Sequence, residues 1–66
     1  MIINLNGHPY EVADGTTLVA LIETIAGSTR GSAAVIDNEV IPRSRWAMQR
    51  LAEGQRVELI TAVQGG

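Results

Sequence analysis

Residues 1–12 alternate apolar and polar side chains and predict a β-hairpin. Residues 1–5 form its first strand, and Asn6-Gly7 is the dipeptide most typical of the type I′ turn that joins two hairpin strands. Residues 8–12 return as the second strand. Because Pro9 has no N–H to donate to a neighbouring strand, we expect this second strand to lie at an edge of the sheet.

An amphipathic helix is predicted after the hairpin. Thr16 and Thr17 supply an N-cap, because a threonine hydroxyl accepts a hydrogen bond from a free backbone N–H of the first turn. Gly27 fits the left-handed position that ends many helices. Between these signals, apolar residues at i, i+3, i+4 and i+7 form one stripe: Leu18, Leu21, Ile22 and Ile25. We expect this stripe to pack on one face of a sheet.

The middle of the chain predicts short elements separated by turns. Residues 28–32 are typical of a loop, and residues 33–37 of a short apolar strand. Residues 40–41, directly before a proline, indicate a further edge strand. Residues 44–51 fit a helical turn.

The last predicted strand spans residues 56–63, where alternation returns. Val57 and Leu59 would face inward. The outward positions of this strand are Glu58, Ile60 and Ala62. Together the elements predict an α+β fold, with a four- to five-stranded mixed sheet and one main helix packed on one face.

Composition limits the chemistry that this chain can perform. Its 66 residues make one small domain with no cysteine, no lysine and a single histidine. Disulfides, thiolate metal sites, cysteine nucleophiles and lysine Schiff bases are therefore excluded. A net charge of −2 argues against nucleic acid as a partner, and no apolar run approaches the ~20 residues of a membrane span. We expect a soluble, cytoplasmic protein that binds neither nucleic acid nor membrane and is a monomer when free.

No motif of an active site is present. His8 follows a turn and precedes a proline, a setting more typical of an exposed turn residue than of a catalytic base. Residues 27–31 contain two glycines but lack the lysine of a phosphate-binding loop and follow a helix rather than a strand. For Trp46, packing in the core or at its rim is favoured over stacking on a ligand. The chain is therefore not expected to be an enzyme.

The C-terminal Gly65-Gly66 is the unusual feature, because two terminal glycines arise by chance in about one sequence in 200. Other distinctive stretches are Asn6-Gly7, residues 13–18 (ADGTTL), residues 36–46 (IDNEVIPRSRW), Glu53-Gly54 with Val57-Glu58, and residues 62–66 (AVQGG). With these stretches the whole chain resembles the ThiS family, the sulfur carriers of thiamine thiazole biosynthesis, which have a β-grasp (ubiquitin-like) fold. Residues 40–46 (VIPRSRW) discriminate most, because other β-grasp carriers share the diglycine but are not expected to share that run.

The resemblance implies a β-grasp domain at residues 1–63 and a flexible diglycine tail at residues 64–66. It implies that an E1-like adenylyltransferase of the ThiF type uses ATP to adenylate the α-carboxylate of Gly66. With sulfur from a donor such as a cysteine desulfurase, the adenylated carboxylate is then converted to a thiocarboxylate. The sulfur of this thiocarboxylate passes to a thiazole synthase of the ThiG type. The carrier itself would bind no cofactor and no metal.

The physical chemistry of the tail agrees with that role. Glycine has no Cβ and opens all backbone conformations, so Gly65 suits a terminus that must thread into the catalytic cleft of another enzyme. The three residues from Gln64 to Gly66 span roughly 10 Å when extended. Gln64 is a mild variant of the small residue often found at that position.

Docking to partner enzymes is expected on the outward face of the sheet. The candidate residues are Ile60 and the residues expected to flank it, which are Glu58, Ala62 and Ile2. The competing interpretation is that Ile60 is an ordinary residue of a half-covered sheet.

Three alternatives remain open from the sequence. The chain could be the small subunit of molybdopterin synthase or another diglycine sulfur carrier. It could be a ubiquitin-like modifier, although without lysine it cannot build isopeptide chains through itself. It could also be a non-covalent interaction module with an inert glycine tail.

Overall fold

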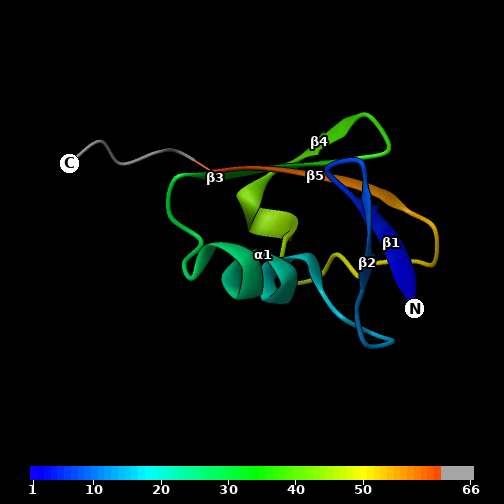
Figure 1. The fold of residues 1–66 in the computed structure, drawn as a ribbon. Coiled ribbons are helices and arrows are strands. Elements are labelled where there is room, and N and C mark those ends of the chain that lie inside the picture. The colour runs from blue at the N-terminus through cyan, green and yellow to red at the C-terminus, as the bar shows by residue number, and fades with distance from the viewer. Residues whose placement is uncertain (62–66) are drawn as a thin grey trace.

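The computed structural model describes residues 1–61, which form one sheet covered on one face by a helix (Figure 1). In chain order the elements are β1 (Ile2–Leu5), β2 (His8–Glu11), α1 (Leu18–Ala26), β3 (Ser32–Ile36), β4 (Glu39–Ile41), the 3-10 helix η1 (Arg43–Arg45) and β5 (Arg56–Thr61). The strand order is β2-β1-β5-β3-β4. No helix within residues 1–61 has the length and apolar character to cross a membrane.

The β1–β2 hairpin forms as predicted. Asn6 and Gly7 have φ of 50° and 87°, the positive values that a type I′ turn requires. The Asn4 side chain accepts a hydrogen bond from the Gly7 N–H at 3.0 Å and supports the turn. Strand β2, which contains Pro9, lies at an edge of the sheet, so the prediction from the missing proline donor is confirmed.

The centre of the sheet joins the two ends of the described chain. Strand β5 pairs in parallel with β1, where Asn4 is opposite Arg56, and antiparallel with β3, where Ala34 is opposite Leu59. The Asn6 amide extends the contact between β1 and β5, because its Oδ1 accepts from the Leu59 N–H at 2.9 Å and its Nδ2 donates to the Leu59 carbonyl at 3.3 Å. This five-stranded mixed sheet with one helix is the β-grasp fold that the sequence predicted.

Helix α1 packs against the inner face of the sheet. Thr17 caps its first turn by accepting from the Ala20 N–H at 3.3 Å, and Gly27 ends it with a φ of 76°. The core joins helix, sheet and loop residues: Ile3, Leu18, Leu21, Ile22, Ala34, Ile36, Ile41, Trp46, Leu51, Val57 and Leu59. Including Ile25 in the buried stripe was wrong, since its side chain is 42% exposed. It lies roughly 10 Å along the axis from Leu18, in the last turn of the helix.

The segment between β4 and β5 is less helical than predicted. Only Arg43–Arg45 form a 3-10 turn, so the prediction of a helical turn over residues 44–51 was wrong in extent. The backbone beyond the turn pairs with the start of α1: Leu18 N–H donates to the Gln49 carbonyl, and Leu51 N–H to the Thr16 carbonyl. These bonds hold residues 49–51 extended.

Trp46 is a core residue, as the sequence favoured. Its side chain is 3% exposed, and its Nε1–H donates to the Ile41 carbonyl at 2.9 Å. The Arg43 guanidinium lies 5.5 Å from the centre of the Trp46 ring, within the range of a cation–π contact. The tryptophan therefore anchors the loop between β4 and β5 to the core.

Candidate functional site

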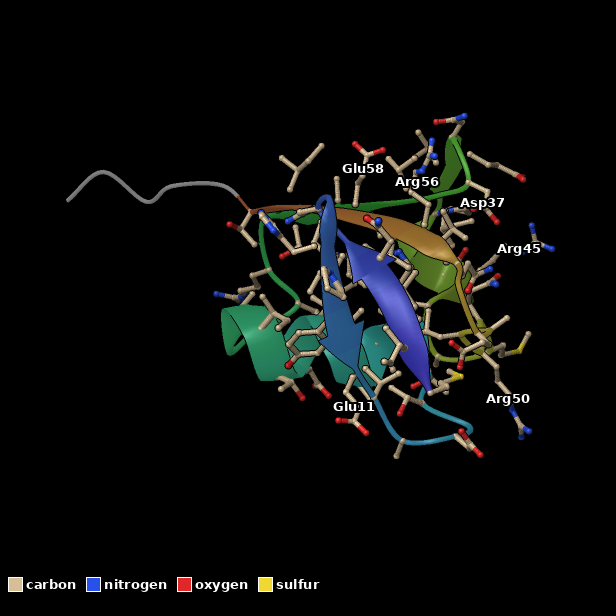
Figure 2. The ribbon with its side chains drawn as sticks, turned by 45° about the vertical axis from the view of Figure 1, so that its right-hand side comes forward. Glu11, Asp37, Arg45, Arg50, Arg56 and Glu58 are labelled. Atoms are coloured by element: carbon tan, nitrogen blue, oxygen red, sulfur yellow. The ribbon has the colours of Figure 1, made fainter. Side chains whose placement is uncertain are left out.

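Strand β5 alternates between the core and the outer face of the sheet, the face opposite α1. Val57 and Leu59 are buried at 0% and 8% exposure, whereas Glu58 is exposed and the Ile60 side chain is 59% exposed. Figure 2 shows Glu58 and Arg56 on the side of the sheet away from the helix. The predicted orientation of these residues is confirmed, and Ile60 is not part of the core.

Ile60 lies in a cluster of aliphatic side chains across three strands. Ala33 on β3 is directly opposite Ile60, and Val35, two residues along β3, is opposite Val40 on β4. Val40 is 69% exposed. We call these residues, Ile60, Ala33, Val35 and Val40, the outer-face patch. Such a group of aliphatic side chains on a small domain is typical of a protein-binding surface.

Three of the four patch residues were missed from the sequence. Residues 33–37 were predicted as a short apolar strand, but that pattern does not tell which strands are its neighbours. The pairing of β3 with both β4 and β5 brings the outward residues together, and that pairing is a property of the tertiary structure.

Ile2 lies on the same face but does not flank Ile60. It is 49% exposed, and its carbonyl accepts from the Gly54 N–H at 2.8 Å, at the start of the chain segment that leads into β5. Because Asn4 is opposite Arg56, Ile2 is level with a position about six residues before Ile60, or roughly 20 Å along the strand. The expectation that Ile2 adjoins Ile60 was therefore wrong.

Polar groups separate these two ends of the outer face. An open depression of about 510 Å³ is lined by Asn4, Asn6, Gly7, Arg56 and Glu58. The outer face is therefore aliphatic around Ile60 and Val40 and polar around Asn4 and Arg56, an asymmetry that suits a partner docking in one orientation.

Residues 1–61 contain no group of three or more His, Asp or Glu side chains arranged to hold a metal ion. The residues expected to carry the chemistry or border the patch, namely Ala62, Gln64, Gly65 and Gly66, lie outside the described residues. So does the boundary predicted between a domain at residues 1–63 and a tail at residues 64–66. The described part of the site ends at Thr61, which is opposite Ser32 on β3.

The fold places the chain among the ubiquitin-like β-grasp domains. The pattern of the ThiS family matches residues 3–66, and the chain belongs to that family. It is 29% identical over 66 residues to the sulfur carrier protein ThiS of Escherichia coli K12, and the match covers all of both chains.

Solved structures support the fold. The crystal structure of the thiamine biosynthesis protein ThiS from Geobacter metallireducens superposes with a TM-score of 0.81 at 22% identity and covers both chains fully. The solution structure of a thiamine biosynthesis protein from the same organism gives a TM-score of 0.82 at 22% identity, over all of this chain and 88% of that one.

Proposed function

We propose that this protein is a sulfur carrier of thiamine thiazole biosynthesis and that its reactive group is the α-carboxylate of Gly66. The observation that carries the proposal is the ThiS family match, which runs through to Gly66. The carrier is a protein substrate rather than an enzyme, since the reacting group is its own terminus and partner enzymes perform each step.

The carboxylate must be activated before it can take up sulfur. An α-carboxyl group has a pKa of about 3.5, so at neutral pH it is an anion and a poor acyl electrophile. An E1-like adenylyltransferase of the ThiF type would join it to AMP at the expense of ATP and release pyrophosphate. A sulfur nucleophile then displaces AMP: sulfide gives the thiocarboxylate directly, whereas the persulfide of a cysteine desulfurase first forms an acyl disulfide, whose S–S bond a thiol reductant must cleave to leave the thiocarboxylate. A thiazole synthase of the ThiG type would receive the sulfur.

Glycine at the last two positions fits this chemistry. Gly65 presents no Cβ to the walls of a narrow catalytic cleft, and Gln64 to Gly66 reach roughly 10 Å when extended. This reach leaves the folded domain outside the cleft. Docking of the domain then fixes where the terminus enters.

The outer-face patch is the surface we assign to that docking. Ile60 and Val40 expose aliphatic area beside the end of β5, so a partner that covers them also lies close to Thr61, the last described residue. Glu58 and Ala62 lie two residues before and two residues after Ile60 in the sequence. Both would border the contact between the patch and the partner enzyme. We place the protein in the cytoplasm, where these soluble enzymes would act.

Intact-mass spectrometry tests the proposal directly. The protein is incubated with ATP, an activating enzyme of the ThiF type and a sulfur donor. We expect a mass gain equal to the replacement of one oxygen by sulfur, mapped to Gly66, and no gain without ATP. A variant lacking Gly66 is the control and should gain nothing. An unchanged mass of the intact chain would contradict the proposal and favour a non-covalent interaction module.

A further inference from the structure

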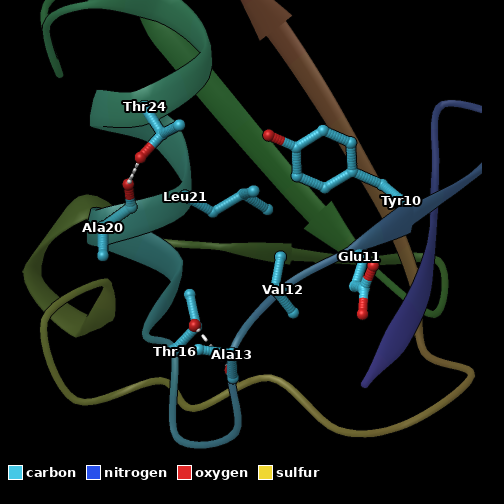
Figure 3. Close-up of a pocket in the computed structure, with 8 residues that line it drawn as sticks. All are labelled: Tyr10, Glu11, Val12, Ala13, Thr16, Ala20, Leu21 and Thr24. Atoms are coloured by element: carbon cyan, nitrogen blue, oxygen red, sulfur yellow. Dashed lines mark hydrogen bonds between the residues drawn. The ribbon is translucent and has the colours of Figure 1, made fainter.

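A groove opens on the flank of the domain, between the edge strand β2 and helix α1. Its volume is about 240 Å³. Figure 3 shows Tyr10 and Val12 on the β2 side, facing Ala20, Leu21 and Thr24 on the helix. Tyr10 and Val12 are only partly buried, so their apolar surfaces form part of the floor. We call this cavity the β2–α1 groove; it shares no residue with the outer-face patch.

The backbone beside the groove is free to pair with another strand. Met1 and Val12 exchange both backbone hydrogen bonds, at 2.8 and 2.9 Å. Bonded and non-bonded pairs alternate along an antiparallel ladder, so the backbone N–H and C=O of Glu11, opposite Ile2, point away from β1. Within residues 1–61 no strand lies on that side of β2. The backbone of Pro9 also points away from β1, but because proline has no N–H it offers a further strand only its carbonyl.

The rim of the groove is acidic. Glu11 lines it, and the exposed Glu23 precedes the lining residue Thr24 on the helix. Asp14, which follows the lining residue Ala13, is paired with the N-terminal ammonium at 3.5 Å. The charge offered to a partner therefore comes from Glu11 and Glu23. None of the lining residues carries a positive charge. A basic side chain is therefore the complement of this rim.

We propose that the β2–α1 groove binds a short extended segment of a partner protein with the side-chain order aliphatic–basic–aliphatic. The central residue exchanges two backbone hydrogen bonds with Glu11 and lies on the same face as the Glu11 side chain, where a lysine or arginine pairs with the carboxylate. The residues on either side point to the opposite face. These two flanking side chains insert into the groove, with Tyr10 and Val12 on one side of them and the helix residues Ala20 and Thr24 on the other.

Pro9 sets the length of this segment. Since it lacks an N–H, pairing cannot continue regularly beyond Glu11 toward the hairpin turn, and only about three residues of the partner are held. Binding is therefore weak and reversible. Because the outer-face patch lies on the opposite side of the sheet from α1, both surfaces can be occupied together.

Nuclear magnetic resonance titration with synthetic peptides tests this inference. The probe is acetyl-Thr-Val-Lys-Val-Thr-amide, and the matched control carries glutamate in place of lysine. We expect amide shifts confined to residues 10–13 and 16–24. The lysine peptide should bind roughly 2- to 20-fold more tightly than the glutamate peptide, the range expected for opposite against like charges on adjacent strands.

Two variants sharpen the test. Glu11→Lys should invert the preference, so that the glutamate peptide binds more tightly. Glu39→Lys is the matched control, because it makes the same charge change at an exposed site on the other edge strand, and it should leave the preference unchanged.

Ala20→Lys fills the groove from an exposed helix position and should abolish binding while the melting temperature is retained. The inference is overturned if neither peptide shifts residues 10–24 at millimolar concentration. Equal affinity for the two peptides, or an unchanged preference in Glu11→Lys, also overturns it.

Discussion

The Asn6 side chain should contribute much of the stability of the junction between the hairpin and β5. It occupies a left-handed position with φ of 50°, and its amide forms two hydrogen bonds with the Leu59 backbone. Asn6→Ala removes both bonds and places a residue with no polar side chain in the left-handed region. Asn6→Asp is the matched control, because aspartate tolerates that region and still accepts from the Leu59 N–H.

The expected magnitudes differ between the two variants. For alanine, the left-handed backbone costs about 1 kcal/mol and the unpaired Leu59 groups cost about 1–3 kcal/mol, so the free energy of unfolding should fall by roughly 2–4 kcal/mol. For aspartate, the loss of one donor should cost about 1 kcal/mol. In a domain of this size, 1 kcal/mol corresponds to roughly 4–8 °C in melting temperature.

Urea unfolding measures both variants, with the fluorescence of Trp46 as the probe, because it is the only tryptophan and is buried. We expect the midpoint to fall in the order wild type, Asn6→Asp, Asn6→Ala. If the alanine variant were as stable as the wild type, the amide would not be part of the sheet and the reasoning would be refuted. Equal losses in both variants would show that the acceptor to Leu59 contributes nothing.

Three further predictions follow from the site and the core. Ile60→Asp should slow adenylation strongly, while the free energy of unfolding changes by less than about 0.5 kcal/mol. Ile2→Asp, on the same face but distant from Ile60, should leave adenylation unchanged. Initial rates of pyrophosphate release measure adenylation of both variants and of the wild type. Gly65→Val should block thiocarboxylate formation without a change in melting temperature, and the prediction fails if intact mass shows the wild-type rate. Trp46→Phe leaves the Ile41 carbonyl without its donor and should cost about 1–3 kcal/mol in urea unfolding; an unchanged midpoint would contradict that contribution.

Local signals in the sequence predicted most elements of the fold. The Asn6-Gly7 turn, the Thr17 cap and the Gly27 stop depend on backbone preferences of single residues, and all three are found where predicted. The β-grasp architecture followed from the order of these elements together with the family resemblance.

The errors over residues 44–51 and over the docking face share a physical cause, which is that both depend on contacts between distant parts of the chain. Residues 49–51 are extended because they pair with the start of α1, and no local pattern in residues 44–51 reveals that pairing. The separation of Ile2 from Ile60 depends on the register of the parallel β1–β5 pair. Val35 and Val40 were missed because the sequence does not show which strands are neighbours, and the neighbouring strands determine which outward residues meet.

Of the strands within residues 1–61, β5 is synthesised last, yet it lies at the centre of the sheet. A nascent chain that ends before Arg56 has β1 and β3 with no strand between them, and its core lacks Val57 and Leu59. Contacts between segments so far apart form late, because the loop between them must first close. Completion of the fold is thereby coupled to synthesis of β5, so a chain that ends before Arg56 lacks both the diglycine and Ile60, the β5 residue of the outer-face patch.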